Sequence, residues 1–196
     1  DHFEFYWFPH TRSTLTKQNN RVRDGEPGRP LHPARRWLED ELLANRVFEV
    51  VNRLTSRRPA LTPRVNAFAS RALRPRTFTA PSYEVFASPR RVVFREMEYA
   101  VPRAALPHAL AEIESWLARS GEHVSFPVEV RFAAADDVWL STAHERETAY
   151  VAVHQYVRVP YHRYFAAVEA IMGELGGRPH WGKLHNLDAS KLAELY

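Results

Sequence analysis

Residues 126–141 of this chain read FPVEVRFAAADDVWLS, and the pattern of this segment predicts the fold class. Residues 128–132 alternate apolar and charged side chains, the period of two that is typical of a strand with one buried face. Asp136 and Asp137 favour a turn, and residues 138–140 predict a second, short strand. Strands joined by so short a turn are antiparallel, so we expect a β-hairpin within an antiparallel or mixed sheet.

Strand patterns recur in three other segments. Residues 2–8 place aromatic side chains on one face and polar ones on the other, and Pro9 ends the run. Residues 92–100 lie between prolines, and residues 149–157 form the last predicted strand. The sheet is therefore expected to collect strands from most of the chain.

Helical patterns separate these strands. Apolar residues recur at helical spacing over residues 35–54 and 103–119, and again after Pro160, while Asp188 is placed to cap a short final helix. The remaining long segments are rich in proline, glycine and charge and predict irregular connections; they are residues 10–34 and 57–90.

Strands and helices do not alternate one to one, which favours an α+β fold over a parallel α/β fold. We expect one domain, residues 1–196, with an antiparallel or mixed sheet and helices packed on one face. A chain of 196 residues that is 45% hydrophobic can bury a substantial core. The opposite face of the sheet would be free to cover a ligand.

Composition excludes several classes of function. The net charge of +4 comes from arginines dispersed among 23 acidic residues, which is a weak pattern for nucleic-acid binding and suits an anionic partner equally well. Without cysteine there are no disulfides or thiolate metal sites, and the histidines lack metal-ligand spacing. Nucleotide-binding glycine motifs and a nucleophile elbow are missing, as are a long apolar span and a secretory signal. The sequence predicts no metal and a cytoplasmic location.

Three residues on predicted strands are candidates for ligand binding. Glu129 and Arg131 share a strand face at about 6.5–7 Å spacing, so they can grip two hydroxyls of a polyol or lactone, or form an ordinary solvated ion pair. His154 shares a face with Tyr156 and is either a ligand contact or a buried core histidine.

A fourth candidate lies in the loop GGRPHWGK at 176–183, where glycines would let the backbone approach a planar ligand. Lys183 is one of only three lysines in an arginine-rich chain, which favours a specific need for an ammonium group there. His180 and Trp181 add a proton-handling ring and an aromatic ring to the same loop. The alternative is a plain surface loop after a helix end.

Five segments in order resemble one family: HFEFYWFPHT at 2–11, FREMEYAVP at 94–102, FPVEVRFAAADDVWLS at 126–141, YVAVHQY at 150–156 and GGRPHWGK at 176–183. Together they resemble the aldonolactone oxidases, the family of D-arabinono-1,4-lactone and L-gulono-1,4-lactone oxidases and dehydrogenases, to which the alditol oxidases are related. The resemblance implies the C-terminal cap domain of a vanillyl-alcohol-oxidase-type flavoenzyme. The N-terminal FAD-binding domain of that family has no counterpart in these residues.

The resemblance also implies roles. The partners would be a sugar lactone, the missing FAD-binding domain and an electron acceptor, oxygen or another; membrane association is implied by the family alone. Glu129 and Arg131 would bind the sugar, His154 would approach the reacting carbon, and Lys183 would bind substrate or lie near the flavin, with His180 and Trp181 beside the cofactor. Either Glu129 or His154 would be the base.

The sequence is compatible with other interpretations. Alditol oxidases carry a small hydroxyl residue where this chain has Tyr156, so either the register differs or the pocket suits a ring. The same residues allow two other hypotheses: a binding domain without catalysis, and an enzyme that oxidises an open-chain alditol. A basic nucleic-acid-binding domain is a weaker third hypothesis.

Overall fold

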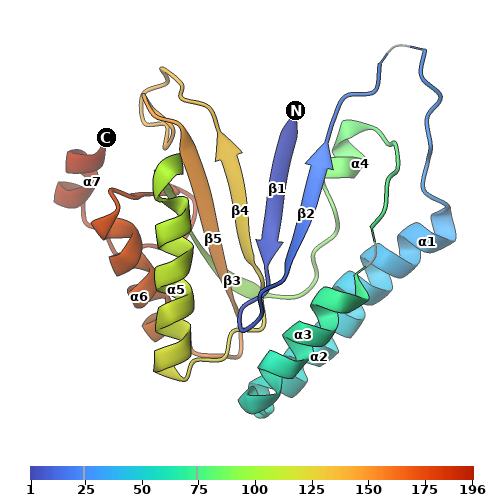
Figure 1. Cartoon of the computed structure of the whole chain (residues 1–196), viewed down its shortest axis with the longest axis horizontal. Coiled ribbons are helices and arrows are strands. Elements are labelled where there is room, and N and C mark those ends of the chain that lie inside the picture. The colour runs from blue at the N-terminus through green and yellow to red at the C-terminus, as the bar shows by residue number, and fades with distance from the viewer. Residues whose placement is uncertain (24, 74) are drawn as a thin grey trace.

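A computed structural model of the chain describes residues 1–23, 25–73 and 75–196. Within these ranges six strands form one sheet, in the order β2-β1-β4-β5-β3-β6, and every neighbouring pair is antiparallel (Figure 1). The strands are β1 (His2–Trp7), β2 (Thr14–Asn19), β3 (Phe94–Pro102), β4 (Val128–Ala133), β5 (Thr148–Tyr156) and β6 (Arg178–Pro179). The predicted α+β class with an antiparallel sheet is confirmed.

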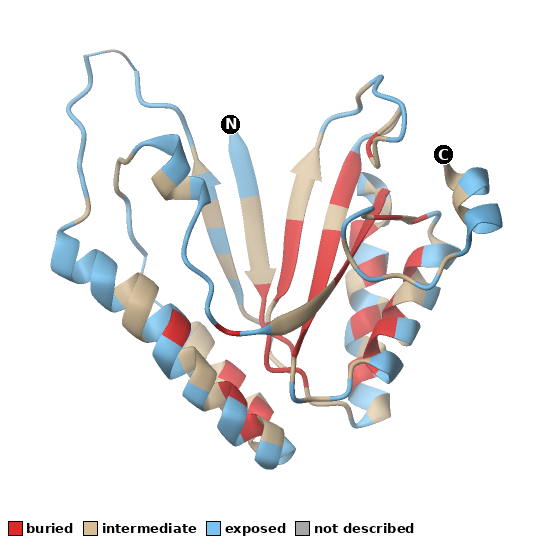
Figure 2. Cartoon of the chain, turned by 180° about the vertical axis from the view of Figure 1, so that it is seen from behind, coloured by how far each residue is buried: buried red, intermediate tan, exposed pale blue. Residues whose placement is uncertain are grey.

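Helices α5 (Leu106–Ser120) and α6 (His162–Glu174) cover one face of this sheet. Their apolar stripes meet the inward side chains of β4 and β5, and Figure 2 shows the buried residues concentrated there. Val130, Val153 and Ile113 are fully buried in this core, and each such side chain contributes roughly 1.5–3 kcal/mol. The core is thus formed by every second residue of the central strands.

The helix predicted over 103–119 is present as a 3-10 turn (Arg103–Ala105) followed by α5. Pro107 lies in the first turn, where its missing N–H costs nothing, and Gly121 ends the helix with a φ of 71°. At the C-terminus, Asp188 accepts a hydrogen bond from the Lys191 amide and caps α7 (Ala189–Leu195).

A second group of helices packs across the lower end of the opposite face. The predicted helix over 35–54 is confirmed and is longer, running through α1 (Pro33–Trp37), a wider π-type segment (Leu38–Val47) and α2 (Phe48–Arg57). Phe48 of α2 packs on Phe126, beside Phe94 and Tyr156 of the sheet. The two groups of helices diverge from the lower end of the sheet, with α5 and α6 on one side and α1 to α3 on the other (Figure 1).

Both connections predicted as irregular contain regular structure. Residues 10–34 include β2, an edge strand whose polar residues gave no apolar signal and whose pairing with β1 defines it. Residues 57–90 include a short 3-10 turn (Pro59–Leu61), α3 (Thr62–Ala72) and α4 (Ser82–Phe86). Pro63 occupies the first turn of α3, where proline is tolerated, so it does not break the helix.

Asn66 anchors α3 to the rest of the fold. Its side-chain amide donates to the carbonyls of Pro9 and Val124, at 3.0 and 2.9 Å, and it is 2% exposed. Polar anchoring of this kind is invisible to hydrophobic periodicity, which explains why the sequence pattern missed the helix.

The hairpin predicted from Asp136 and Asp137 is wrong. Residues 138–140 form no strand, and β4 pairs instead with β1 and with β5, beyond a long loop at 134–147. The Asp136 carboxylate accepts hydrogen bonds from the Val138 amide and the Ser141 hydroxyl, which closes a compact turn in place of a strand. Antiparallel pairing, the basis of the fold-class prediction, still holds for β4.

None of the helices in the described ranges has the length and hydropathy that a bilayer span requires.

Candidate functional site

The candidate site lies on the sheet face that α5 and α6 leave uncovered. Alternation puts Glu129 and Arg131 of β4 on this face while Val128 and Val130 point into the core. Strand register then sets their neighbours, since Glu129 lies opposite Tyr6 on one side and Ala152 on the other. The polar face is therefore assembled across β1, β4, β5 and β3.

Six side chains form what we call the charge cluster: Glu96, Glu98, Glu129, Arg131, His154 and Lys183. Glu98 is its centre. Its carboxylate accepts from Arg131 Nη2 at 2.6 Å and from Lys183 Nζ, and the side chain is only 3% exposed. A buried carboxylate with two cationic donors orients both cations at one place on the sheet.

Arg131 is the member of the cluster that is most open to solvent. Its Nε lies 3.5 Å from Glu129 Oε1, and its side chain is 41% exposed, against 8% for Glu129. Burial by itself would lower the pKa of Arg131, but the carboxylates of Glu98 and Glu129 outweigh this and raise it. The guanidinium is thus a permanent cation held at the surface of the site.

Glu96 links the other two cationic groups. It accepts from Lys183 Nζ at 2.5 Å, and its Oε1 lies 3.2 Å from His154 Nε2. Partial burial opposes ionisation, yet the hydrogen bonds from His154 and Lys183 prevail and lower the pKa of Glu96 to about 2. Glu96 is therefore an anion at neutral pH and a structural acceptor for both groups.

The two ring nitrogens of His154 both face acceptors. Nδ1 lies 3.2 Å from the Pro127 carbonyl and Nε2 faces the Glu96 carboxylate, so both contacts are satisfied together only when both nitrogens carry a proton. The ring is 5% exposed and packs between Phe94 and Phe126. Both ring nitrogens of His154 are therefore engaged by groups of the protein itself.

The loop at 176–183 reaches the site because it attaches to β3. Pro179 pairs with Tyr99 through β6, His180 N donates to the Glu98 carbonyl, and Leu184 N donates to the Glu96 carbonyl. These contacts on both sides of Lys183 bring its ammonium over the two glutamates. The loop is therefore not a plain surface loop after a helix end, because it supplies the Lys183 ammonium to the charge cluster.

The start of this loop depends on Gly177. A Cβ added there would lie 2.6 Å from the Met172 carbonyl oxygen, and the Gly177 amide donates to that same oxygen at 2.8 Å. Only glycine lets the chain leave α6 this closely.

His180 and Trp181, the other two predicted cofactor contacts, use their side chains for hydrogen bonds outside the charge cluster. His180 Nδ1 accepts from the Gly182 amide, which makes it part of the loop's own turn. Trp181 Nε1 donates to the Leu140 carbonyl, and its ring lies on Tyr196 with centroids 4.6 Å apart. Tyr156 does not shape the site either, because it is 1% exposed and donates its hydroxyl to Glu49.

Sequence reasoning missed Glu96 and Glu98. The signal was present in residues 94–102, where Glu96 and Glu98 alternate with the buried Met97 and Tyr99. Tyr6 adds a neutral donor beside Glu129, since burial and then the nearby charges of Glu129 and Glu4 raise its pKa well above the ordinary value. The hydroxyl of Tyr6 donates to Glu4 at 3.1 Å.

The arrangement suits a small ligand with several hydroxyl groups. Guanidinium and ammonium groups donate, glutamates accept, and a neutral tyrosine can do both. All of them stand on one sheet face except the Lys183 ammonium, which the loop at 176–183 brings over that face. Side chains mounted on strands are held more precisely than side chains on loops.

Comparison with known proteins identifies relatives. A family model described as D-arabinono-1,4-lactone oxidase matches residues 1–196. The chain is 40% identical over 196 residues to L-gulono-1,4-lactone dehydrogenase of Mycobacterium tuberculosis, and 28% and 29% identical over 207 and 203 residues to the L-gulonolactone oxidases of Bos taurus and Mus musculus. All of this chain is covered in each case but only 45% of each relative, so it spans less than half their length. The chain belongs to the D-arabinono-1,4-lactone oxidase family, whose members are flavoenzyme oxidoreductases.

Proposed function

We propose that this chain is the substrate-binding cap domain, residues 1–196, of an FAD-dependent enzyme that oxidises an aldono-1,4-lactone of the D-arabinono or L-gulono type. The observation that carries the proposal is the meeting of Arg131, Glu129 and Lys183 on one sheet face. The names of the relatives supply the substrate class. The rest of the relatives' length leaves room for a flavin-binding half.

The residues present fit a flavin placed over this face. Arg131 is a partly exposed permanent cation, and the electron-rich edge of a flavin is favoured by such a charge. When bound, the flavin would accept the hydrogen that leaves the lactone carbon as hydride. The chain's own residues bind the sugar, orient it and take up the hydroxyl proton.

Glu129 is the better of the two candidate bases. Its carboxylate lies beside Arg131 on the site face, whereas both nitrogens of His154 point at acceptors. His154 is then a positioning residue that helps Glu96 to hold Lys183. Proton transfer to Glu129 would form the alkoxide next to the Arg131 guanidinium, which stabilises developing negative charge.

Lys183 is assigned to the substrate rather than to the flavin. Its ammonium is already shared between Glu96 and Glu98, so much of its charge is neutralised locally. A held ammonium still donates a directed hydrogen bond to a sugar hydroxyl, which requires geometry more than net charge.

The test is Arg131→Ala in the full-length flavin-loaded protein. We expect kcat/KM for the lactone to fall by about 100-fold or more, because a charge that stabilises the transition state is lost. The flavin content should stay unchanged, and Arg131→Lys should recover part of the activity. Activity with an open-chain alditol, measured in parallel, distinguishes the two substrate classes.

Arg163→Ala is the matched control, because Arg163 lies in the first turn of α6 and its side chain is 67% exposed. An equal loss of flavin and turnover in Arg131→Ala would mean that Arg131 holds the flavin or the fold and does not act on the lactone. A full-length protein that oxidises no sugar lactone or alditol would instead favour a binding domain without catalysis.

A further inference from the structure

Three consecutive apolar side chains project from the loop between β4 and β5. Val138, Trp139 and Leu140, here called the loop tip, are 60%, 87% and 62% exposed. Single exposed apolar residues are normal on a protein surface, but a contiguous group that includes a tryptophan marks an interaction site. Trp139 is also more exposed than any other large apolar residue of the described ranges.

The loop tip is held in place by its own hydrogen bonds. Asp136 accepts from the Val138 amide and from the Ser141 hydroxyl, while its backbone bonds to Ala143 and Glu145. Leu140 has a φ of 63°, a left-handed conformation that costs a branched residue about 1–2 kcal/mol. A strained backbone that is fixed by neighbouring bonds is typical of a functional position.

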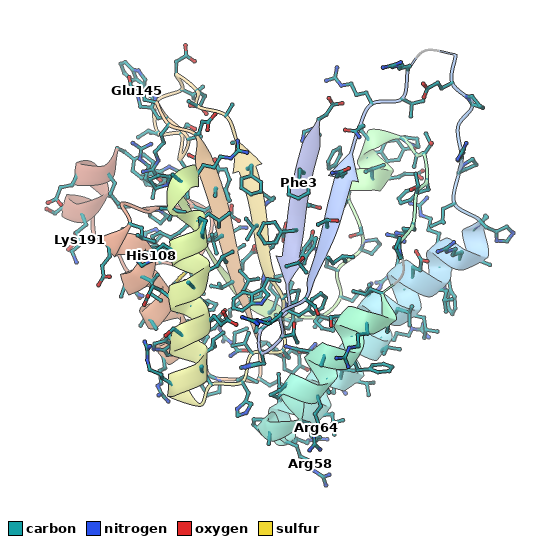
Figure 3. The ribbon with its side chains drawn as sticks, viewed as in Figure 1. Phe3, Arg58, Arg64, His108, Glu145 and Lys191 are labelled. Carbon is teal, nitrogen blue, oxygen red and sulfur yellow. The ribbon has the colours of Figure 1, made fainter. Side chains whose placement is uncertain are left out.

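Two contacts hold the loop that carries the tip against the segments that carry the charge cluster. The Thr142 and Tyr150 hydroxyls lie 2.8 Å apart, and Tyr150 is paired with Arg131 in the sheet. On the other side, Trp181 from the Lys183 loop donates to the Leu140 carbonyl. Figure 3 shows the loop, marked by Glu145, extending beyond the ends of β4 and β5. The loop tip therefore stands at the edge of the candidate site.

We propose that the loop tip is a docking point for the flavin-binding half of the full-length polypeptide. This rests on the proposed function, which requires that half to lie over the charge cluster. The relatives keep more than half of their length outside the region matched here, so a covering partner within one polypeptide has the necessary size. A tryptophan on a loop held by hydrogen bonds beside the site can then anchor that partner at the edge.

Oxidative footprinting of tryptophans in the full-length protein tests this. In the 196-residue chain, Trp139 should be oxidised faster than every other tryptophan, as its exposure indicates. In the full-length protein its rate should fall to that of Trp7, which is 8% exposed. If Trp139 remains the fastest tryptophan, the proposal is wrong. Protection that appears only at concentrations where a dimer forms would assign the loop tip to a second copy and also overturn it.

Variants supply a second readout. Trp139→Ser should speed flavin release from the full-length protein by about 30-fold, the loss expected for an aromatic anchor, whereas Trp139→Phe should change it little. Phe68→Ser is the control, because Phe68 is 75% exposed on α3. Equal release rates in Trp139→Ser and Phe68→Ser would contradict docking.

Different results would contradict the proposed flavin function and the proposed docking surface. A full-length protein that binds no flavin but protects Trp139 would contradict the flavin function and keep the docking surface. Bound flavin with Trp139 freely oxidised would contradict the docking surface alone.

Discussion

Glu98 shows how one buried side chain organises the site. It is almost fully buried, yet its carboxylate contacts both Arg131 and Lys183. Removing one partner of such a group leaves a buried charge unpaired, which is costly, so the three residues depend on one another. The ion pairs of the charge cluster hold the donor groups in fixed positions. For the site, this positioning matters more than the contribution of the ion pairs to the stability of the fold.

The pKa of Glu96 leads to a prediction about acid stability. A folded-state pKa of about 2, below the ordinary 4.5, means that the ionised carboxylate stabilises the fold above about pH 4.5 and that this contribution is lost as the pH falls toward 2. Glu96→Gln should lower the free energy of unfolding at pH 7 by about 1–2 kcal/mol after allowing for solvent screening. Urea denaturation should show this difference shrinking between pH 4.5 and pH 2.

Glu114→Gln serves as the control because Glu114 lies exposed on α5. It should leave the pH dependence of the parent protein intact. If Glu96→Gln lowers the free energy of unfolding by the same amount at every pH, the hydrogen-bonded carboxylate is not the source of the loss.

At the level of elements, the edge of β3 decides where Lys183 lies. The loop after α6 bonds to β3 through β6 and through the amides of His180 and Leu184. Helix α6 and strand β3 pack in the same core, so the loop has fixed points at both ends. A short loop with fixed ends can carry a catalytic or binding lysine without losing precision.

Gly177→Ala tests this arrangement. The added Cβ would meet backbone at 2.6 Å, so we expect a loss of about 1–3 kcal/mol in the free energy of unfolding. Under the proposed function, lactone oxidation by the full-length protein should fall as well, since Lys183 follows in the same loop. Chemical denaturation and kcat/KM measure the two effects.

Gly173→Ala is a matched comparison in the neighbouring turn. A Cβ at Gly173, within α6, meets nothing within 4 Å, so alanine should be neutral or stabilising by up to about 1 kcal/mol. Equal stability of the two variants would mean that the close approach at Gly177 is relaxed by a small backbone shift.

The whole molecule has an asymmetric design. One sheet face is sealed by α5 and α6, while the charge cluster lies on the other, and helices cover only the lower end of that second face. A face that carries donors and acceptors but has no opposing wall can bind a small ligand only weakly, because most of the ligand surface stays in water. A covering partner would complete the site.

Under the proposed function, flavin binding should therefore require the complete polypeptide. The purified 196-residue chain should show little or no visible flavin absorbance, and the full-length protein should carry stoichiometric FAD. Supplying the missing half to the chain should restore activity. Stoichiometric flavin on the 196-residue chain would contradict this, and a full-length protein free of flavin would contradict the proposed function.

Local patterns in the sequence determined the central strands, the helices α5 and α6, and the shared face of Glu129 and Arg131, because alternation and helical periodicity act over a few residues. They did not reveal β2 or α3, whose formation depends on pairing with β1 and on the buried amide of Asn66. Nor did they show that 138–140 would be an exposed loop. Only the tertiary structure brought Glu96 and Glu98 to Lys183, 87 and 85 residues away, since strand order and register are set by long-range pairing that no short pattern encodes.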